Sequence, residues 1–256
     1  MMLSVKNLTK SFGGVQASRD ISIDFPDGSL TAIIGPNGAG KTTFFNLVSG
    51  ALTADSGRVI FDGQDIVGKS SLEVVRLGMV RAFQVAALFP SLSVMDALTA
   101  AVTSHQRRSS ALFRSFPLEG TEARVEEILE LLGLTSKATT LSRNLSHGDQ
   151  KLLDIGLALA MDPKVLLLDE PTAGMGPDER WRMIGKVQHL WEAKKMTVLF
   201  IEHDMDIVFK IAQTIHVLKY GAILAQGTAA EIRSNQDVID AYLGTDHHLA
   251  QAAGEQ

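Results

Sequence analysis

The chain has no cysteine, no excess of positive charge and no long hydrophobic run. Disulfides and thiolate metal sites are therefore excluded. The formal net charge of −5 at pH 7 gives no electrostatic reason to expect binding to nucleic acid. No uninterrupted apolar run approaches the roughly 20 residues that a membrane-spanning helix needs. The first six residues alternate like a strand, without the layout of a signal peptide. A role at a membrane would have to come through a partner protein.

The alternation of strand-like and helix-like segments indicates an α/β fold. Hydrophobic residues make up 45% of the 256, which is enough to fill a sizeable core. Strands are predicted within 3–34 and at 57–61, 79–83, 165–169, 197–201 and 215–218, and helices at 41–48, 93–105, around 125–132, 148–161, 177–195 and 204–213. This order favours a largely parallel sheet with helices packed on it. The mainly helical stretch between the first and second groups of strands predicts an inserted helical subdomain.

Residues 35–42 form the most informative stretch. Their letters, Gly-Pro-Asn-Gly-Ala-Gly-Lys-Thr, fit the phosphate-binding pattern G-x-x-x-x-G-K-[ST] between a buried strand and a helix. The glycines let backbone N–H groups turn toward phosphates, and the helix adds the positive end of its dipole. Lys41 is expected to reach the β- and γ-phosphates, and the Thr42 hydroxyl to bind Mg²⁺. A glycine-rich turn without a ligand is the weaker alternative.

Two carboxylates, Asp169 and Glu170, follow an apolar strand-like run at 165–168. Asp169 would hold Mg²⁺ through water, and Glu170 would polarise a water for in-line attack on a γ-phosphate. A strand followed by an acidic turn would explain these letters as well if they stood alone. Their position downstream of a phosphate-binding loop favours the catalytic interpretation.

Three weaker signals support the same chemistry. Residues 145–150, Leu-Ser-His-Gly-Asp-Gln, precede a helix, where a Ser hydroxyl and a Gly N–H would form an anion site. A simple Ser-capped helix fits these letters equally well. Gln84 and His203 each follow a strand-like run, so they could contact Mg²⁺ with the attacking water and the γ-phosphate, respectively. A single Gln or His at such a position would not by itself indicate a function.

Together these features resemble the ATP-binding subunits of ABC transporters over residues 3 to 244. The resemblance rests on five elements in the family's order and approximate spacing: 35–42, Gln84, 145–150, 166–170 and His203. It implies a P-loop, RecA-like parallel-sheet core with an N-terminal antiparallel β-subdomain and an inserted α-helical subdomain. The implied bounds are 1–84 and 162–244 for the catalytic core, 85–161 for the helical subdomain and 245–256 for a polar tail.

The resemblance implies ATP and Mg²⁺ as cofactors and gives each candidate residue a role. ATP would be bound by Phe12, stacked on adenine, and by Gly35, Asn37, Gly38, Ala39, Gly40, Lys41, Thr42 and Thr43. The implied Mg²⁺ ligands are Thr42, Gln84 and Asp169. For Phe12 a place in the core beside the first strand is the alternative.

The implied catalytic residues are Glu170, His203 and Gln84. Glu170 would be the base, His203 would position the γ-phosphate, and Gln84 would report its state to the helical subdomain and a membrane partner. Two subunits would sandwich two ATP molecules head to tail. Ser146 and Gly148 would then bind the γ-phosphate of ATP held by the opposite subunit.

Two places depart from the family's usual letters. The signature usually reads Leu-Ser-Gly-Gly-Gln, whereas its third and fifth positions here are His147 and Asp149. Function is expected to survive because Ser146 and Gly148 remain. Gly176 stands where the loop after Glu170 usually ends in Asp, which weakens the case for contacts between subunits through that loop.

Within the family the chain looks most like the ATPases of branched-chain amino acid importers. The similar runs are 12–14, 81–84, 173–175, 202–205 and 241–244, with an insertion at about 105–121. The insertion is either a contact near the membrane partner or a solvated loop. An ATPase subunit is implied that is peripheral on the cytoplasmic face of the inner membrane and drives a permease by ATP-dependent dimer closure. Partners would be transmembrane permeases, a second ATPase subunit and, indirectly, an extracytoplasmic solute-binding protein.

Four other classes of protein are less well supported by the sequence than the importer ATPase. A lipopolysaccharide-exporting ATPase has a similar length and a similar Tyr-Leu-Gly ending. A soluble ABC-type ATPase acting on DNA or ribosomes usually carries a coiled coil or two cassettes, which this sequence lacks. A kinase or GTPase would not need Glu170 and 145–150, and a non-catalytic scaffold would not need the full set of catalytic residues. Cargo cannot be chosen from an ATPase subunit, since this branch also moves urea, other amino acids and aromatic acids.

Overall fold

The computed structural model describes residues 1–82, 89–105 and 120–243, which belong to two compact units. The first unit comprises Met1–Leu77 and the chain from Thr197 onward, and the second comprises Gly78–Met196. Gln84, most of the predicted insertion at 105–121 and the predicted tail at 245–256 lie outside the described residues. The described part of the predicted helical subdomain, 85–161, falls within the second unit, and its bounds stay a prediction.

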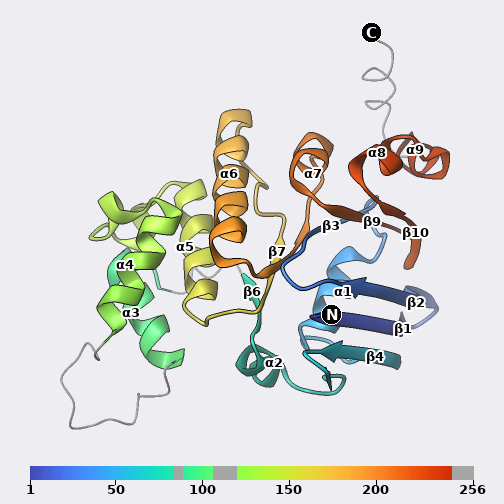
Figure 1. The fold of residues 1–256 in the computed structure, drawn as a ribbon, viewed down its shortest axis with the longest axis horizontal. Helices are drawn as coiled ribbons and strands as arrows, with labels where there is room; N and C mark the ends of the chain where they lie inside the picture. Colours follow the sequence, from blue (N-terminus) through green and yellow to red (C-terminus); the bar gives the residue numbers. More distant parts are fainter. Residues whose placement is uncertain (83–88, 106–119, 244–256) are drawn as a thin grey trace. The chain divides into compact units, whose positions relative to one another are not determined.

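An antiparallel sheet forms one part of the first unit (Figure 1). Its order is β2-β1-β4-β5, with β1 at Leu3–Phe12, β2 at Val15–Phe25, β4 at Ser56–Phe61 and β5 at Gln64–Asp65. Along β2, buried Ile21, Ile23 and Phe25 alternate with exposed Ser22 and Asp24. One face of the sheet therefore packs on the core and the other meets solvent. The predicted N-terminal antiparallel β-subdomain is confirmed.

Parallel strands form the other part of the first unit. β3 (Leu30–Ile34) pairs in parallel with β8 (Thr197–Ile201) on one side and β9 (Thr214–Lys219) on the other. β10 (Ala222–Gly227) is antiparallel to β9. Every residue of β3 and β8 is buried, as expected for parallel strands covered on both faces. The helices of this unit are α1 (Lys41–Val48), α2 (Ser71–Leu77), α7 (Met205–Ile211), α8 (Ala229–Arg233) and α9 (Gln236–Leu243).

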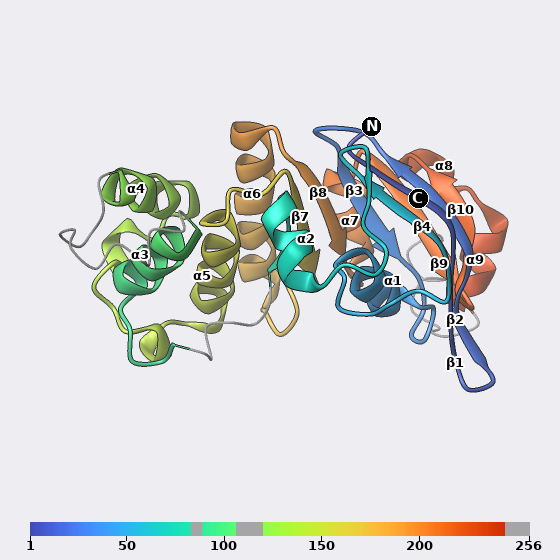
Figure 2. The same cartoon turned by 90° about the horizontal axis from the view of Figure 1, so that it is seen from below.

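The second unit combines two parallel strands with a group of helices (Figures 1 and 2). β6 (Met79–Ala82) pairs in parallel with β7 (Val165–Asp169). The helices are α3 (Val94–His105), α4 (Thr121–Leu132), α5 (His147–Leu159) and α6 (Pro177–Lys194), with 3₁₀ turns at Thr135–Lys137 and Ser142–Asn144. Gly156 of α5 faces Leu98 of α3 and Leu132 of α4, so these three helices pack on one another. Among the described residues, no helix has the length and apolar character needed to cross a bilayer.

The α/β fold class is confirmed, and the predicted strands and helices are present with bounds that shift by a few residues. Pro177 begins α6, and Gly133 ends α4 with a φ of 68°. The elements β5, β10, α2, α8 and α9 were not predicted from the sequence. β10 contains small residues and no fully buried position, and α8 has only five residues, so neither produces a strong periodic signal.

Candidate functional site

The predicted phosphate loop joins buried β3 to α1 in the first unit. Gly35 has a φ of 150°, and a Cβ there would lie 2.2 Å from the carbonyl oxygen of Leu218. Gly40 stands before α1 with a φ of 100°, and a Cβ there would lie 2.3 Å from the carbonyl oxygen of Ala17. Both positions require glycine. Because the first N–H groups of a helix have no partner within it, the end of this loop presents backbone donors to an anion.

Lys41 lies folded inside this loop. Its Nζ donates to the carbonyl oxygens of Gly35 at 2.7 Å and Pro36 at 3.1 Å, and the residue is buried. Asn37, Gly38 and Thr42 are exposed, Thr43 is half-buried and Ala39 is buried. The loop thus holds a positive charge at its centre while its tip and the Thr42 hydroxyl stay accessible. This arrangement fits a phosphate chain approached by backbone and ammonium together.

Tyr242 of α9 contacts the same loop, which the sequence analysis did not anticipate. The Gly35 N–H donates a hydrogen bond to the Tyr242 hydroxyl. Burial raises the pKa of Tyr242 well above its usual range, so the hydroxyl stays protonated. α9 is therefore hydrogen-bonded to the first residue of the loop. The only sequence signal was the run 241–244, whose likeness to one family branch said nothing about this contact.

His203 lies at the same edge of the parallel strands as the loop. The register pairs Ile33 with Ile201, so Gly35 and His203 each stand two residues beyond paired positions. The chain then turns at Asp204, whose carboxylate accepts the N–H groups of Asp206 and Ile207 and caps α7. The His203 side chain is exposed. The structure thus places the loop and His203 at the same edge of the parallel strands, and His203 follows a strand as predicted.

Phe12 is the last residue of β1 and pairs with Val15, the first residue of β2. Figure 2 shows the hairpin that these two strands form. Half of it is exposed, and the Nζ of Lys10 lies 5.7 Å from the ring centroid. The alternative of a core phenylalanine is therefore wrong. An exposed ring remains available for stacking on a flat ligand.

Asp169 ends β7 in the second unit and forms an ion pair with Arg81 of β6. Arg81 is the less exposed partner, at 9% of its side chain against 22% for Asp169. The guanidinium neutralises the carboxylate that was predicted to serve Mg²⁺. Sequence analysis could not find this pair because the two residues are 88 positions apart.

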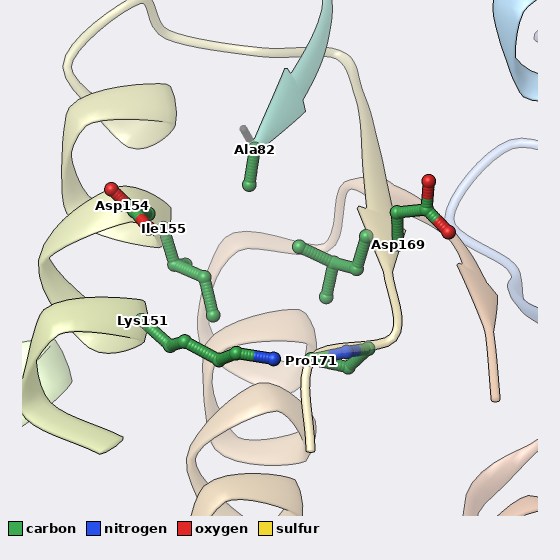
Figure 3. A pocket seen from close by; sticks show the side chains of 7 residues that line it. Ala82, Lys151, Asp154, Ile155, Asp169 and Pro171 are labelled. Carbon is green, nitrogen blue, oxygen red and sulfur yellow. The ribbon is translucent and has the colours of Figure 1, made fainter. Parts of the chain in front are cut away.

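Glu170 adopts a left-handed backbone conformation with a φ of 49°. Non-glycine residues rarely adopt it, and such strain persists only where neighbours enforce it. The Nζ of Lys151, a buried residue of α5, donates to the Glu170 carbonyl oxygen at 2.8 Å. Figure 3 shows Lys151 extending toward Pro171, while the Asp169 carboxylate points away from it. Lys151 is thus a supporting residue that sequence analysis missed.

A small cavity lies beside Lys151, Asp154 and Ile155 of α5 and the end of β7 (Figure 3). Its volume of about 30 Å³ is far below that of a ligand pocket. This cavity therefore has room for water and is no nucleotide site.

Ser146 caps α5 and is tied to Asp149. The Ser146 Oγ accepts the Asp149 N–H at 3.2 Å and donates to the Asp149 carboxylate at 2.7 Å. Lys137 forms an ion pair with the same carboxylate. Gly148 is buried against Glu179 of α6, whose Oε1 would lie 2.3 Å from a Cβ at position 148. His147 faces the carbonyl oxygen of Ala173, 3.2 Å from its Nε2.

The candidate residues divide between the two units. Phe12, the loop 35–43 and His203 belong to the first, whereas Ser146, Gly148, Asp169 and Glu170 belong to the second. Gln84 lies outside the described residues. No group of three or more His, Asp or Glu side chains capable of holding a metal occurs in the described part of the chain.

Comparison with protein families gives two matches. Residues 18–173 match the model described as ABC transporter, and residues 222–248 match that of the branched-chain amino acid ATP-binding cassette transporter. The second match includes the segment of α9 that contacts the phosphate loop.

Curated proteins of similar sequence carry related names. The chain is 37% identical over 251 residues to the high-affinity branched-chain amino acid transport ATP-binding protein LivG of Escherichia coli strain K12, covering 95% of this chain and 98% of that protein. It is 39% identical over 248 residues to the probable LivG of Archaeoglobus fulgidus, covering 95% of each.

Solved structures agree with this likeness. A nucleotide-free ATP-binding cassette from an ABC transporter is 34% identical with a TM-score of 0.81, over 94% of this chain and 98% of that one. A cassette in its ADP conformation is 34% identical with a TM-score of 0.82, over 95% and 98% of the two chains. A dimeric cassette bound to ADP and Pi, at 24% identity, has a TM-score of 0.74 over 89% of this chain and 99% of that one, which extends the fold likeness.

Proposed function

Because the chain belongs to the ABC transporter family of ATP-binding proteins, we propose that it is the ATP-hydrolysing subunit of an importer. Its cargo would be branched-chain amino acids or related small polar or carboxylate solutes. The names of its relatives support this class of cargo, as does the match of residues 222–248. The observation that carries the ATPase activity is the loop at 35–42, with two required glycines and Lys41 folded inside it.

ATP binds at this loop through backbone donors and the Lys41 ammonium. Lys41 exchanges its bonds to the Gly35 and Pro36 carbonyls for phosphate oxygens, which are stronger charge-assisted partners. Phe12 stacks on the adenine from the exposed hairpin. Thr42, Asp169 and Gln84 would hold Mg²⁺, whose charge would offset that of the phosphates. The hard oxygen donors of these three side chains suit that ion.

For hydrolysis to occur, a water must lie next to the γ-phosphate. Glu170 accepts a proton from that water as the water oxygen bonds to the γ-phosphorus, and the bond from this phosphorus to the bridging oxygen breaks, so that ADP and phosphate leave. His203, two residues beyond the paired Ile201, donates to a γ-phosphate oxygen. The loop N–H groups and Lys41 stabilise the charge that spreads over the phosphoryl oxygens.

The chain works with other subunits. Ser146 and Gly148 meet the γ-phosphate of ATP bound to an opposite ATPase subunit, so each chain holds two half-sites. The dimeric cassette among the structural neighbours has the same fold and supports this assembly. ATP-dependent closure of the ATPase dimer drives a conformational change in transmembrane permeases at the cytoplasmic face of the membrane. An extracytoplasmic solute-binding protein delivers the cargo.

Affinity purification tests the assignment to a transporter. Tagged protein carrying Glu170→Gln is recovered from native membranes with Mg-ATP, and the co-purifying proteins are identified. Two integral-membrane permeases, with or without a second ATPase, are expected, and their cognate binding protein would identify the cargo. Recovery of only soluble partners, such as ribosomal proteins, would refute the importer.

A further inference from the structure

The Ser146 hydroxyl is already engaged at both its donor and its acceptor side. It accepts the Asp149 N–H at 3.2 Å and donates to the Asp149 carboxylate at 2.7 Å. A serine hydroxyl carries a single proton. While that proton is shared with Asp149, it cannot be donated to a phosphate. A phosphate that uses Ser146 must therefore take the hydroxyl away from Asp149.

Lys137 covers this carboxylate from outside the helix. It comes from the 3₁₀ turn Thr135–Lys137 and forms an ion pair with the same Asp149 oxygen that accepts from Ser146. The Asp149 side chain is 15% exposed and that of Lys137 is 43% exposed. Burial alone would raise the pKa of Asp149, but hydrogen bonds from Lys137 and Ser146 bring that pKa below its ordinary value. The carboxylate is thus charged at neutral pH, and the pair has no net charge.

Further charged groups surround Ser146 and Gly148. Glu179, Arg182 and Lys186 of α6 line the same cavity as Lys137, Ser146 and Asp149. The Glu179 carboxylate lies against Gly148. An incoming phosphate therefore approaches carboxylates as well as cations. Whether it is attracted or repelled depends on how the carboxylates are neutralised.

A second serine cap in the same unit shows what is particular here. Ser93 donates to the Asp96 carboxylate at 2.6 Å and accepts the Asp96 N–H at 3.1 Å, as Ser146 does with Asp149. Asp96 forms no ion pair with any residue that the structure describes. The serine–aspartate cap is therefore an ordinary helix start in this chain. What distinguishes residue 149 is the lysine that neutralises it.

We propose that Asp149 and Lys137 together control access of the opposite subunit's γ-phosphate to the Ser146 hydroxyl. Asp149 holds the hydroxyl in the resting chain, and Lys137 cancels the charge that would otherwise repel the phosphate. The inference rests on the proposed function, in which Ser146 and Gly148 meet that phosphate. Both are positioning residues. The pair explains how an acid can stand where the family signature usually has an uncharged glutamine.

ATP-dependent dimerisation in a Glu170→Gln background tests the pair, because slow hydrolysis lets the closed dimer accumulate. Sedimentation velocity gives the ATP concentration at half-dimerisation. Lys137→Met is expected to raise it about tenfold, as an uncompensated carboxylate meets the phosphate. Asp149→Gln is expected to lower it about threefold, because Ser146 is released. In the Lys137→Met, Asp149→Gln double variant, the increase in this ATP concentration caused by Lys137→Met should disappear.

Matched controls separate this effect from helix capping and from misfolding. Asp96→Asn removes the equivalent capping acid of α3 and should leave half-dimerisation unchanged. Lys137→Arg keeps the charge and should stay close to the parent. Thermal melting of each variant without nucleotide shows whether the fold is intact.

The outcomes distinguish failure of the inference from failure of the proposed function. Ser146→Arg blocks the phosphate site by bulk, so a Ser146→Arg chain that still dimerises with ATP would refute the role of Ser146 itself. If Ser146→Arg abolishes the dimer while folded Lys137→Met has no effect, the inference alone is wrong. The inference would also be wrong if Lys137→Met raised the ATP concentration at half-dimerisation equally with and without Asp149→Gln, because Lys137 would then act on the phosphate directly.

Discussion

The two regions that the account assigns to phosphate are built differently. The loop 35–42 presents backbone N–H groups and the buried Lys41, held by the required glycines at 35 and 40. The start of α5 presents an exposed serine that is tied to a carboxylate, which a lysine neutralises. A bond is exchanged in both regions when an anion binds, but the first offers an ammonium bonded to neutral carbonyls, whereas the second offers a hydroxyl bonded to a carboxylate. This difference suits a site that keeps its own nucleotide and a site that engages another subunit's nucleotide only transiently.

The largest effect is expected at the first region. Lys41→Ala should weaken binding of ATP by at least roughly 100-fold, because it removes charge-assisted bonds to phosphate oxygens. Titration calorimetry with ATP measures this, and Lys6→Ala, at an exposed position of β1 in the same unit, should bind normally. Unchanged affinity in Lys41→Ala would show that the loop is not the nucleotide site.

An effect of comparable size, on turnover instead of binding, is expected in the second unit. Glu170→Gln should lower kcat for ATP hydrolysis by about 10²- to 10⁴-fold, the span expected for loss of a general base. Affinity for ATP should stay near normal because the loop is untouched. Glu192→Gln, the same exchange at an exposed position of α6, serves as the control. Near-normal turnover in Glu170→Gln would remove Glu170 from the mechanism.

The stability of the folded chain is expected to depend on pH through a buried histidine on β9, the strand next to β3, which leads into the loop 35–42. His216 of β9 is buried and pairs in register with Ile33, and burial lowers its pKa to about 4. Between about pH 6.5 and 4 the unfolded chain therefore binds a proton that the folded chain does not, so stability falls as pH falls. This group alone should remove about 2 kcal/mol of unfolding free energy between pH 8 and 5.

The contribution of His216 can be isolated by difference. Urea unfolding of the parent and of His216→Leu at pH 8 and pH 5 removes the contribution of carboxylates common to both. The variant should lose less stability than the parent. Equal losses would mean that His216 takes up its proton in the folded chain.

The smallest effect concerns the support of Glu170. Lys151→Met should lower kcat about tenfold with little change in KM for ATP, because a charged hydrogen bond that holds a strained backbone is worth about 1.5–3 kcal/mol. Lys151→Arg should restore most of the rate. Arg124→Met removes a similar bond, from a guanidinium to the Leu159 carbonyl at 3.0 Å on the same helix. An equal loss of kcat in Arg124→Met would indicate general loosening of α5.

Much of the fold and the site's main residues could be predicted, whereas their supporting contacts could not. Apolar runs and caps determine β3, β7, β8 and the helices locally, so the bounds differ by few residues. The supports depend on side chains distant in sequence: Arg81 and Asp169 are 88 residues apart, Lys151 and Glu170 are 19 apart, and Lys137 and Asp149 are 12 apart. No periodicity encodes such pairs. The left-handed backbone of Glu170 was likewise invisible, because glutamate shows no preference for it.

In the proposed function, the two regions act on the same ATP from different subunits. Mixing Lys41→Ala chains with Ser146→Arg chains tests it most directly, since each variant alone should lack ATPase activity. Activity is expected to return on mixing, because the mixed dimer pairs one intact loop with one intact Ser146. If mixed dimers form and remain inactive while the parent dimer is active, the account is contradicted.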